Sequence, residues 1–358
     1  MYKQLLNGLA LALLLSACRG VTPRITAVCD TDAVGNDTVK WETKPAIDGL
    51  VKVFASTNPD HIPETFPVAI ANIADLYLRV VNDTPAHRRY YTLLFDDRFR
   101  IKVAARRINV PGTQNFRDLG GYPVYASHKR VRWGMLYRSA QLDTSRPATL
   151  QALRDLGIRT IIDLRETSER DSSATLPPDS NALPRVLHIP IHAGSMNRLL
   201  DGIHHNAIHS DTVYRIVERV NRHIVSRHAS EIHQIFTALL DRRNYPAVIQ
   251  CNTGKGRTGI ASALVLATLG VDDESILYDY RLSNRFFSIP AAASYAYALP
   301  VSSQEALTTI YSARENFLNA AKDEIERRYG SVDSYLRHAV GLTKDEIRQL
   351  QAILLEEE

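Results

Sequence analysis

One stretch decides the fold of this chain: Val248-Ile249-Gln250-Cys251-Asn252-Thr253-Gly254-Lys255-Gly256-Arg257-Thr258-Gly259. Residues 247–250 predict a short buried strand. Two glycines then permit a tight loop, and an apolar helix is expected from Thr258 to Leu269. Such a loop directs its backbone N–H groups and the positive end of the helix at one point, a geometry that binds phosphate.

Two side chains in this stretch have the chemistry of a reacting phosphate site. Arg257 can hold phosphate oxygens bidentately, and the same positive field should lower the pKa of Cys251 below the ordinary ~8.5 of a thiol. A thiolate beneath a bound phosphate is a nucleophile, and Thr258 can donate its hydroxyl to the sulfur. A single cysteine at a strand end is usually a small buried hydrophobe. Cys-x5-Arg-Thr-Gly between a strand and a helix nevertheless predicts nucleophilic catalysis, and the spacing of a Walker-type loop is absent.

Strands and helices alternate on both sides of the loop. A strand is expected at 160–164, and helices at 149–156, 230–240 and through most of 273–358. This order predicts an α/β domain over 106–358, with a mostly parallel central sheet flanked by helices and with a helical lid and tail. Residues 37–105 instead show short alternating strands, which predict a small immunoglobulin-like β-sandwich with Trp41 in its core.

The N-terminus reads as a secretion signal. An apolar run at 9–15 is too short to cross a bilayer, and it leads into Leu15-Ser16-Ala17-Cys18. Small residues before a cysteine resemble the bacterial lipobox, so we expect a signal peptide at 1–17, lipidation of Cys18 and a tether at 18–36. Plain secretion with cleavage nearby is the alternative. The protein would then be extracytoplasmic and anchored to a bacterial membrane, in the periplasm or at the outer membrane.

Composition excludes several other classes. The 358 residues carry a net charge of +4 without a basic run, which does not suit a nucleic-acid-binding protein. Only three cysteines are present (Cys18, Cys29 and Cys251), so no disulfide framework is expected. No carboxylate or cysteine completes a metal site with His204, His205 and His209, and we expect neither metal nor cofactor. The oligomeric state stays open.

Further motifs follow in order along the chain: Asn115-Phe116-Arg117-Asp118-Leu119-Gly120-Gly121, Leu136-Tyr137-Arg138-Ser139, Ile162-Asp163-Leu164-Arg165 with Glu169, Asp279-Tyr280, and Tyr329-Gly330-Ser331. With the loop, they resemble the bacterial cysteine-dependent protein tyrosine phosphatases, in the branch of the secreted mycobacterial tyrosine/phosphoinositide phosphatase. The resemblance spans residues 106–355. It implies hydrolysis of phosphate monoesters through a phosphocysteine on Cys251, with phosphotyrosine proteins as substrates.

The resemblance also implies substrate contacts. The loop residues that would cradle the phosphate are Asn252, Thr253, Gly254, Lys255 and Gly256. Asn115, Arg117 and Asp118 are expected to brace the loop or contact substrate at its rim, and a purely structural turn is equally open.

The chain departs from this branch at two positions of the loop. Gln250 stands where histidine is usual, and Gly256 stands where aspartate is usual. Lys255 would place a second positive charge at the pocket floor or rim, or would be an ordinary solvated lysine. These features keep two alternatives open: a phosphoinositide or inositol-phosphate phosphatase, and an inactive module that binds phospho-ligands.

The general acid is the least determined role. The leaving oxygen needs a proton, usually from an aspartate on a neighbouring loop. The resemblance favours Asp163, with Asp201 and His192 in reserve. Asp163 could instead be a structural carboxylate paired with Arg165 or Arg138.

Overall fold

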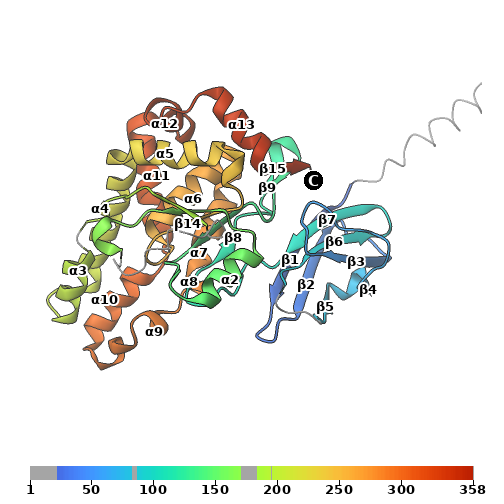
Figure 1. The fold of residues 1–358 in the computed structure, drawn as a ribbon, viewed down its shortest axis with the longest axis horizontal. Helices are drawn as coiled ribbons and strands as arrows, with labels where there is room; N and C mark the ends of the chain where they lie inside the picture. The colour runs from blue at the N-terminus through green and yellow to red at the C-terminus, as the bar shows by residue number, and fades with distance from the viewer. Residues whose placement is uncertain (1–21, 83–86, 171–183, 195, 358) are drawn as a thin grey trace, which may run out of the picture. The chain divides into compact units, whose positions relative to one another are not determined.

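A computed structural model describes residues 22–82, 87–170, 184–194 and 196–357 (Figure 1). The described residues fall into two compact units: a first unit within Met1–Pro85 and Arg89–Val103, and a second unit within Ala86–Arg88 and Ala104–Glu358. The predicted signal peptide and the lipidation of Cys18 lie outside the described residues. Within the described part of the chain, no helix is long and apolar enough to cross a membrane.

The first unit contains two antiparallel sheets. The three-stranded sheet has the order β1 (Arg24–Thr31), β2 (Asp37–Lys44), β5 (Tyr77–Val80). The four-stranded sheet has the order β4 (Ala69–Asn72), β3 (Leu50–Ser56), β6 (Tyr90–Phe95), β7 (Phe99–Ala104). Trp41 is buried against the edge of the Phe95 ring, and its indole N–H donates to the Ile73 carbonyl at 2.8 Å. The prediction that Trp41 is a core residue is confirmed.

Strand β1 corrects the predicted tether. It lies within 18–36 and pairs with β2 over its whole length, from Arg24 opposite Lys44 to Thr31 opposite Asp37. Its inward positions are Ile25, Ala27 and Cys29, of which only Cys29 is fully buried. Two of these residues are small, so the alternation is weakly apolar and the segment reads as polar and aperiodic in sequence.

The second unit is built on a five-stranded sheet. Its order is β13 (Arg185–His188), β12 (Thr160–Asp163), β14 (Ala247–Gln250), β11 (Leu136–Ser139), β8 (Arg117–Asp118). The first four strands are mutually parallel and β8 is antiparallel to β11. The sheet is therefore mostly parallel, as predicted, with one antiparallel edge. A small separate sheet joins β15 (Leu355–Glu357), β10 (Lys129–Val131) and β9 (Pro123–Val124).

Helices cover both faces of this sheet (Figure 1). Alternate residues of β14 point to opposite sides. Val248 joins a cluster with Leu153 of α2 (Pro147–Asp155), whereas Ile249 joins the main core under α6 (Gly256–Leu269). The other main-core helices are α4 (Ser210–Arg227), α5 (Ala229–Leu240), α7 (Asp273–Arg281), α11 (Glu315–Tyr329), α12 (Val332–His338) and α13 (Lys344–Leu354). Most side chains of α6 are buried, which explains its nearly continuous apolar sequence.

The remaining helices contribute no fully buried residue to the main core. They are α3 (Met196–His204), α8 (Ser283–Phe286), α9 (Ile289–Ala292) and α10 (Val301–Tyr311). Helices α3 and α10 share an apolar cluster that includes Leu199, Ile203 and Leu307.

Candidate active site

The predicted phosphate loop joins the end of β14 to the start of α6. Gly254 adopts φ +65°, and a Cβ there would lie 2.4 Å from the backbone of Ser139. Only glycine fits at this position, because the loop passes directly over β11. Gly256 has open space around it, so no steric reason requires glycine there.

Cys251 is a buried, reduced thiol at the first position of this loop. Burial opposes ionisation, but the charge of Arg257 and hydrogen bonds from Thr258 and the Gly254 N–H outweigh it, so the pKa of Cys251 lies below that of an ordinary thiol. Among the described residues the Thr258 hydroxyl has no other hydrogen-bond partner, which leaves it available to the thiolate. The positive charge and the hydrogen-bond donors that the sequence predicted therefore lie around the Cys251 sulfur.

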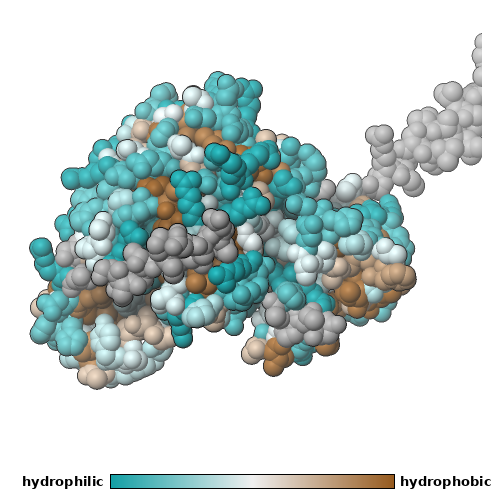
Figure 2. Space-filling model, in the orientation of Figure 1, coloured by the Kyte–Doolittle hydropathy of each residue, from teal (hydrophilic) through white to brown (hydrophobic). Residues whose placement is uncertain are grey.

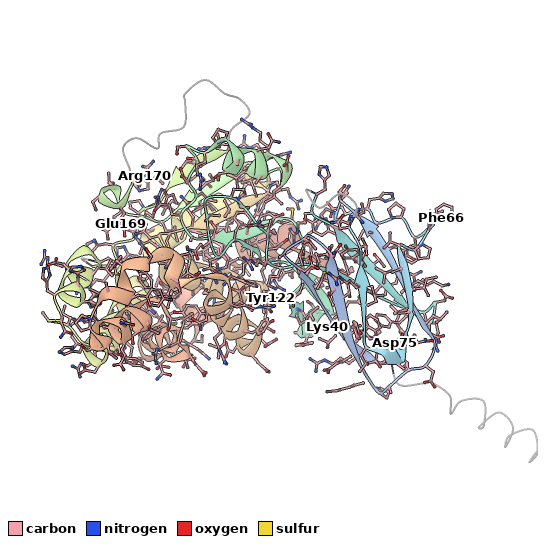
Figure 3. All side chains as sticks on the ribbon, turned by 90° about the horizontal axis from the view of Figure 1, so that it is seen from below. Lys40, Phe66, Asp75, Tyr122, Glu169 and Arg170 are labelled. Atoms are coloured by element: carbon pink, nitrogen blue, oxygen red, sulfur yellow. The ribbon has the colours of Figure 1, made fainter. Side chains whose placement is uncertain are left out.

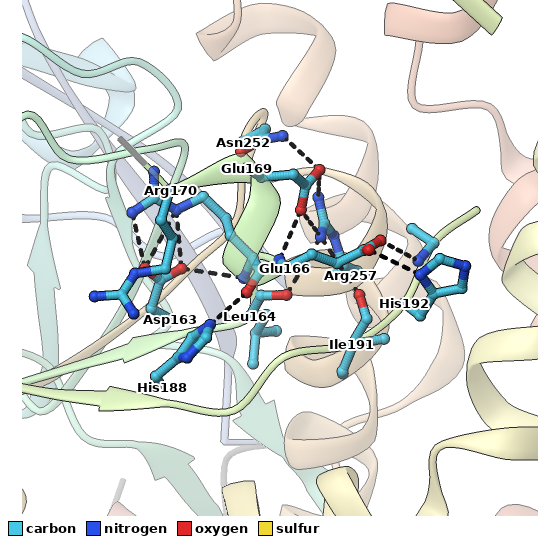
Figure 4. A network of polar contacts seen from close by, with 12 residues as sticks. Asp163, Leu164, Glu166, Glu169, Arg170, His188, Ile191, His192, Asn252 and Arg257 are labelled. Carbon is cyan, nitrogen blue, oxygen red and sulfur yellow. Dashed lines mark hydrogen bonds and ion pairs between the residues drawn. The ribbon is translucent and has the colours of Figure 1, made fainter. Parts of the chain in front are cut away.

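Arg257 is held by a carboxylate that the sequence reasoning did not place in the site. Its Nη1 lies 2.5 Å from Oε2 of Glu169, and its Nη2 lies 2.9 Å from Oε1 (Figure 4). Asn252 of the loop donates to the same Oε1 at 2.7 Å. Burial raises the pKa of Glu169, but the Arg257 contacts more than offset it, so the pKa of Glu169 lies below its usual range. Glu169 therefore fixes the guanidinium and one loop residue together.

The turn that carries Glu169 also reaches the segment after β13. Glu169 Oε2 accepts the N–H of Glu166 at 2.8 Å, in the short turn η3 (Thr167–Glu169). Glu166 Oε2 lies 2.8 Å from Nδ1 of His192, and Nη1 of Arg257 donates to the Ile191 carbonyl at 3.4 Å (Figure 4). His192 is thus placed next to the arginine, with an exposed ring.

Asn115 supports the loop from behind. Its Nδ2 donates to the carbonyls of Thr253 at 3.0 Å and Gly254 at 3.1 Å. Arg138 donates to the same Gly254 carbonyl at 2.7 Å. These bonds hold the carbonyls of Thr253 and Gly254 toward Asn115 and Arg138, so the loop N–H groups face the other way.

Arg117 and Asp118 do not lie at a substrate rim. Both have 0% of their surface exposed. Arg117 binds Asp279, and Asp118 accepts the N–H groups of Gly120 and Gly134 at 2.7 and 2.8 Å. The predicted contact with substrate at the rim is wrong for these two residues, because they form β8, the buried edge strand that pairs with β11.

Asp163 is occupied as a structural carboxylate. It is 1% exposed, and Arg165 donates to both of its oxygens at 2.8–3.2 Å. Arg170 lies 3.8 Å from Oδ2. Both oxygens of Asp163 thus accept from Arg165, which is the structural pairing that the sequence offered as the alternative, and its role as general acid stays a prediction. Asp201, the other carboxylate in reserve, lies exposed on α3 beside His205.

Lys255 and Gln250 each make a buried hydrogen bond to the backbone of another segment. Lys255 is 6% exposed and donates from Nζ to the Ile310 carbonyl of α10, and burial lowers its pKa to about 7. Gln250 is buried, and its Oε1 accepts the N–H of Leu142 at 2.9 Å. Lys255 is therefore not an ordinary solvated lysine, and the second positive charge predicted at the pocket floor or rim stays a prediction.

A model described as a tyrosine phosphatase family matches residues 108–356, about seven-tenths of the chain. The chain belongs to this family. A candidate tyrosine-protein phosphatase of Cupriavidus necator is 29% identical over 242 residues, which cover 65% of this chain and 84% of that protein. The triple specificity protein phosphatase PtpB of Mycobacterium tuberculosis is 27% identical over 280 residues, 69% of this chain and 98% of that protein. The crystal structure of Pseudomonas aeruginosa TpbA is similar at 18% identity and a TM-score of 0.25, over 51% of this chain and 90% of that chain.

The family match and the two named relatives agree on the activity. This protein is a phosphoric monoester hydrolase of the protein-tyrosine phosphatase type.

Proposed function

We propose that Cys251 is the nucleophile of this phosphatase. Its sulfur attacks phosphorus, an S–P bond forms, and the P–O bond to the leaving oxygen breaks. Water then attacks the phosphocysteine, the S–P bond breaks, and inorganic phosphate and the thiolate are released. The observation that supports this assignment is a buried, reduced thiol with a lowered pKa at the start of a loop that leads into α6.

Arg257 and the loop N–H groups are assigned to the equatorial oxygens. Charge builds up there in the transition state, and donors that are already in place stabilise it without reorganisation. Glu169 acts as a positioning residue because it holds both the guanidinium and Asn252.

We assign the proton for the leaving oxygen to His192 rather than to Asp163. A histidine hydrogen-bonded to a carboxylate is a suitable general acid, since the Glu166 contact orients the ring. His192 is exposed and follows Ile191, whose carbonyl contacts Arg257. Asp163 is buried and bound by Arg165.

Phosphotyrosine in proteins is the proposed substrate. The phosphoinositide alternative rested on Lys255 and Gly256, and it is less favoured because Lys255 donates to the Ile310 carbonyl and both named relatives are tyrosine or multiple-specificity protein phosphatases. We further propose that Cys18 carries a lipid and holds the enzyme on the outer side of a bacterial membrane. The support for this is the apolar run at 9–15 followed by Leu15-Ser16-Ala17-Cys18.

The deciding experiment measures turnover of an aryl phosphate in EDTA. Wild-type protein should be active, and Cys251→Ser should lose about a thousandfold or more. The matched control is Cys29→Ser, a change at a buried cysteine of the first unit that should leave turnover unchanged. Acid quenching during turnover of radiolabelled substrate should trap phosphate on the wild-type protein only.

Two results would contradict the assignment. Full activity of Cys251→Ser would remove it as the nucleophile. A folded, reduced wild-type protein that binds phosphotyrosine without turnover would be a binding module.

A further inference from the structure

Exposed apolar side chains are concentrated in the first unit. Among the residues that the structure describes, nine of the fourteen exposed large hydrophobic residues lie in the first unit, although it is much the smaller unit. Four of the five in the second unit are tyrosines, whose hydroxyl groups suit a surface exposed to water. The nine are Val28, Val34, Leu50, Phe66, Val68, Ile70, Leu76, Tyr77 and Val81. Such an excess of exposed apolar side chains in a small unit indicates a surface that binds a partner or a membrane.

Four of these residues form one face, which we call the β3–β4 face: Leu50, Phe66, Val68 and Ile70. Phe66, Val68 and Ile70 alternate along the approach to β4 and along β4 itself, so they point to the same side. The antiparallel register sets Ile70 opposite Lys52, which is two residues from Leu50 on β3. The opposite side of β3 carries the fully buried Val51 and Val53.

The β3–β4 face is visible on the surface. Figure 2 shows brown side chains gathered over the β3 and β4 part of the first unit. Phe66 is 84% exposed and lies at the outer edge of this unit in Figure 3. Strand β4 is also an edge strand, so only β3 pairs with it in the four-stranded sheet.

The chain itself indicates what covers this face. Arg24, the first residue of β1, follows Cys18 by six residues. Six residues reach at most about 20 Å even when fully extended. A lipid on Cys18 would therefore keep the first unit at the bilayer surface, where exposed apolar side chains can enter the boundary between headgroups and acyl chains.

We propose that the β3–β4 face docks on a lipid bilayer, as a second attachment beside the proposed lipid on Cys18. The inference rests on that anchor and is independent of the phosphatase chemistry. Lys52 on this face is paired with Asp97 at 2.6 Å, and Arg100 is paired with Glu64 at 3.0 Å. Docking should therefore depend on apolar burial, with little dependence on anionic lipid or salt.

The test uses the mature, lipidated full chain in phosphatidylcholine vesicles that contain lipids brominated at defined depths. Both native tryptophans, Trp41 and Trp133, are buried, so a new tryptophan at the surface reports its own surroundings. Phe66→Trp should show a blue shift and strong quenching by bromine about 5–10 Å below the headgroups. The matched control is Val34→Trp, at a similarly exposed turn between β1 and β2 of the same unit, which should show neither. Added phosphatidylglycerol should leave both results unchanged.

Each other outcome rejects the proposal for a stated reason. If the Phe66→Trp variant floats with the vesicles but its new indole is not quenched, the anchor is retained and the docking is absent. Equal quenching of the Phe66→Trp and Val34→Trp variants removes the assignment to this face. Self-association that covers the new indole of Phe66→Trp in solution would make the face a dimer interface. Protein that fails to float lacks the anchor, whereas aryl phosphatase activity in the same sample reports separately on the proposed catalytic function.

Discussion

Asp279 of α7 determines whether the phosphate loop is supported, and Asp279→Asn tests this. Its carboxylate lies 3.1 Å from Nε of Arg117 and 2.6 Å from Nη1 of Arg138, and all three side chains are at most 1% exposed. The Tyr122 hydroxyl donates to it at 3.0 Å. Arg138 in turn donates to the Gly254 carbonyl in the loop. The substitution keeps the shape of the side chain and removes its charge.

The expected loss of stability is large because two buried guanidiniums would then lack a counter-charge. Removing one partner of a buried ion pair costs about 3–5 kcal/mol. The free energy of unfolding of a whole domain is about 5–15 kcal/mol, so the variant should fold but should have little stability left. Burial opposes ionisation of Asp279, but Arg117 and Arg138 outweigh it and hold its pKa well below the usual range. This contribution is present above the unfolded-state pKa of about 3.9 and is lost as pH falls below it, so the variant should show less acid dependence than the wild type.

The assay is the urea concentration at which aryl phosphatase activity is half lost, because activity reports on the unit that carries the loop. For Asp279→Asn the midpoint should fall by about 1 M or more at neutral pH, given a slope of about 1–3 kcal/mol per M. Asp345→Asn is the control, since Asp345 pairs with Arg348 at the surface and should move the midpoint little. A loss below about 1 kcal/mol, or equal effects of the two variants, would refute the reasoning.

Three further predictions concern the site. Thr258→Val should raise the pKa of Cys251, and so slow its alkylation by iodoacetamide at pH ~6; an unchanged rate would remove the hydroxyl from thiolate stabilisation. Lys255 has a folded-state pKa of about 7 and an unfolded one of about 10.4, so wild-type stability should rise with pH across that window, and Lys255→Met should remove the rise. His192→Gln should slow hydrolysis of phenyl phosphate about a hundredfold while 4-nitrophenyl phosphate changes little, because the better leaving group needs less protonation. Asp163→Asn should not show this difference, and the reverse pattern would restore Asp163 as the acid.

The sequence predicted what is contiguous and missed what is assembled from distant segments. Cys251, Arg257 and the loop glycines follow one another, so their strand-loop-helix geometry could be inferred from spacing. Glu169 stands 88 residues before Arg257, and no local pattern tells a carboxylate that binds the arginine from one in solvent. Asp163 differs, because the sequence already offered its pairing with Arg165 two residues along, and only the fold shows that this pairing forms.

For the fold as well, the sequence predicted the elements with a clear apolar pattern and missed one without such a pattern. The central strands are apolar runs between helices, and their order as a mostly parallel sheet follows from connection rules. Strand β1 was assigned to the tether because only one of its residues, Cys29, is fully buried. Its pairing with β2 is therefore supported mainly by backbone hydrogen bonds, which leave no apolar pattern in a sequence.

Glu169 also restricts how Arg257 can hold a phosphate. The carboxylate takes both terminal nitrogens, and Nη1 further contacts the carbonyls of Leu164 and Ile191. Among the described residues none accepts from Nε. Guanidinium has five N–H donors in a fixed plane, so a bidentate grip remains possible only along the edge formed by Nε and the free hydrogen of Nη2. The phosphate must therefore approach along this side edge of the guanidinium, next to the end that Glu169 occupies.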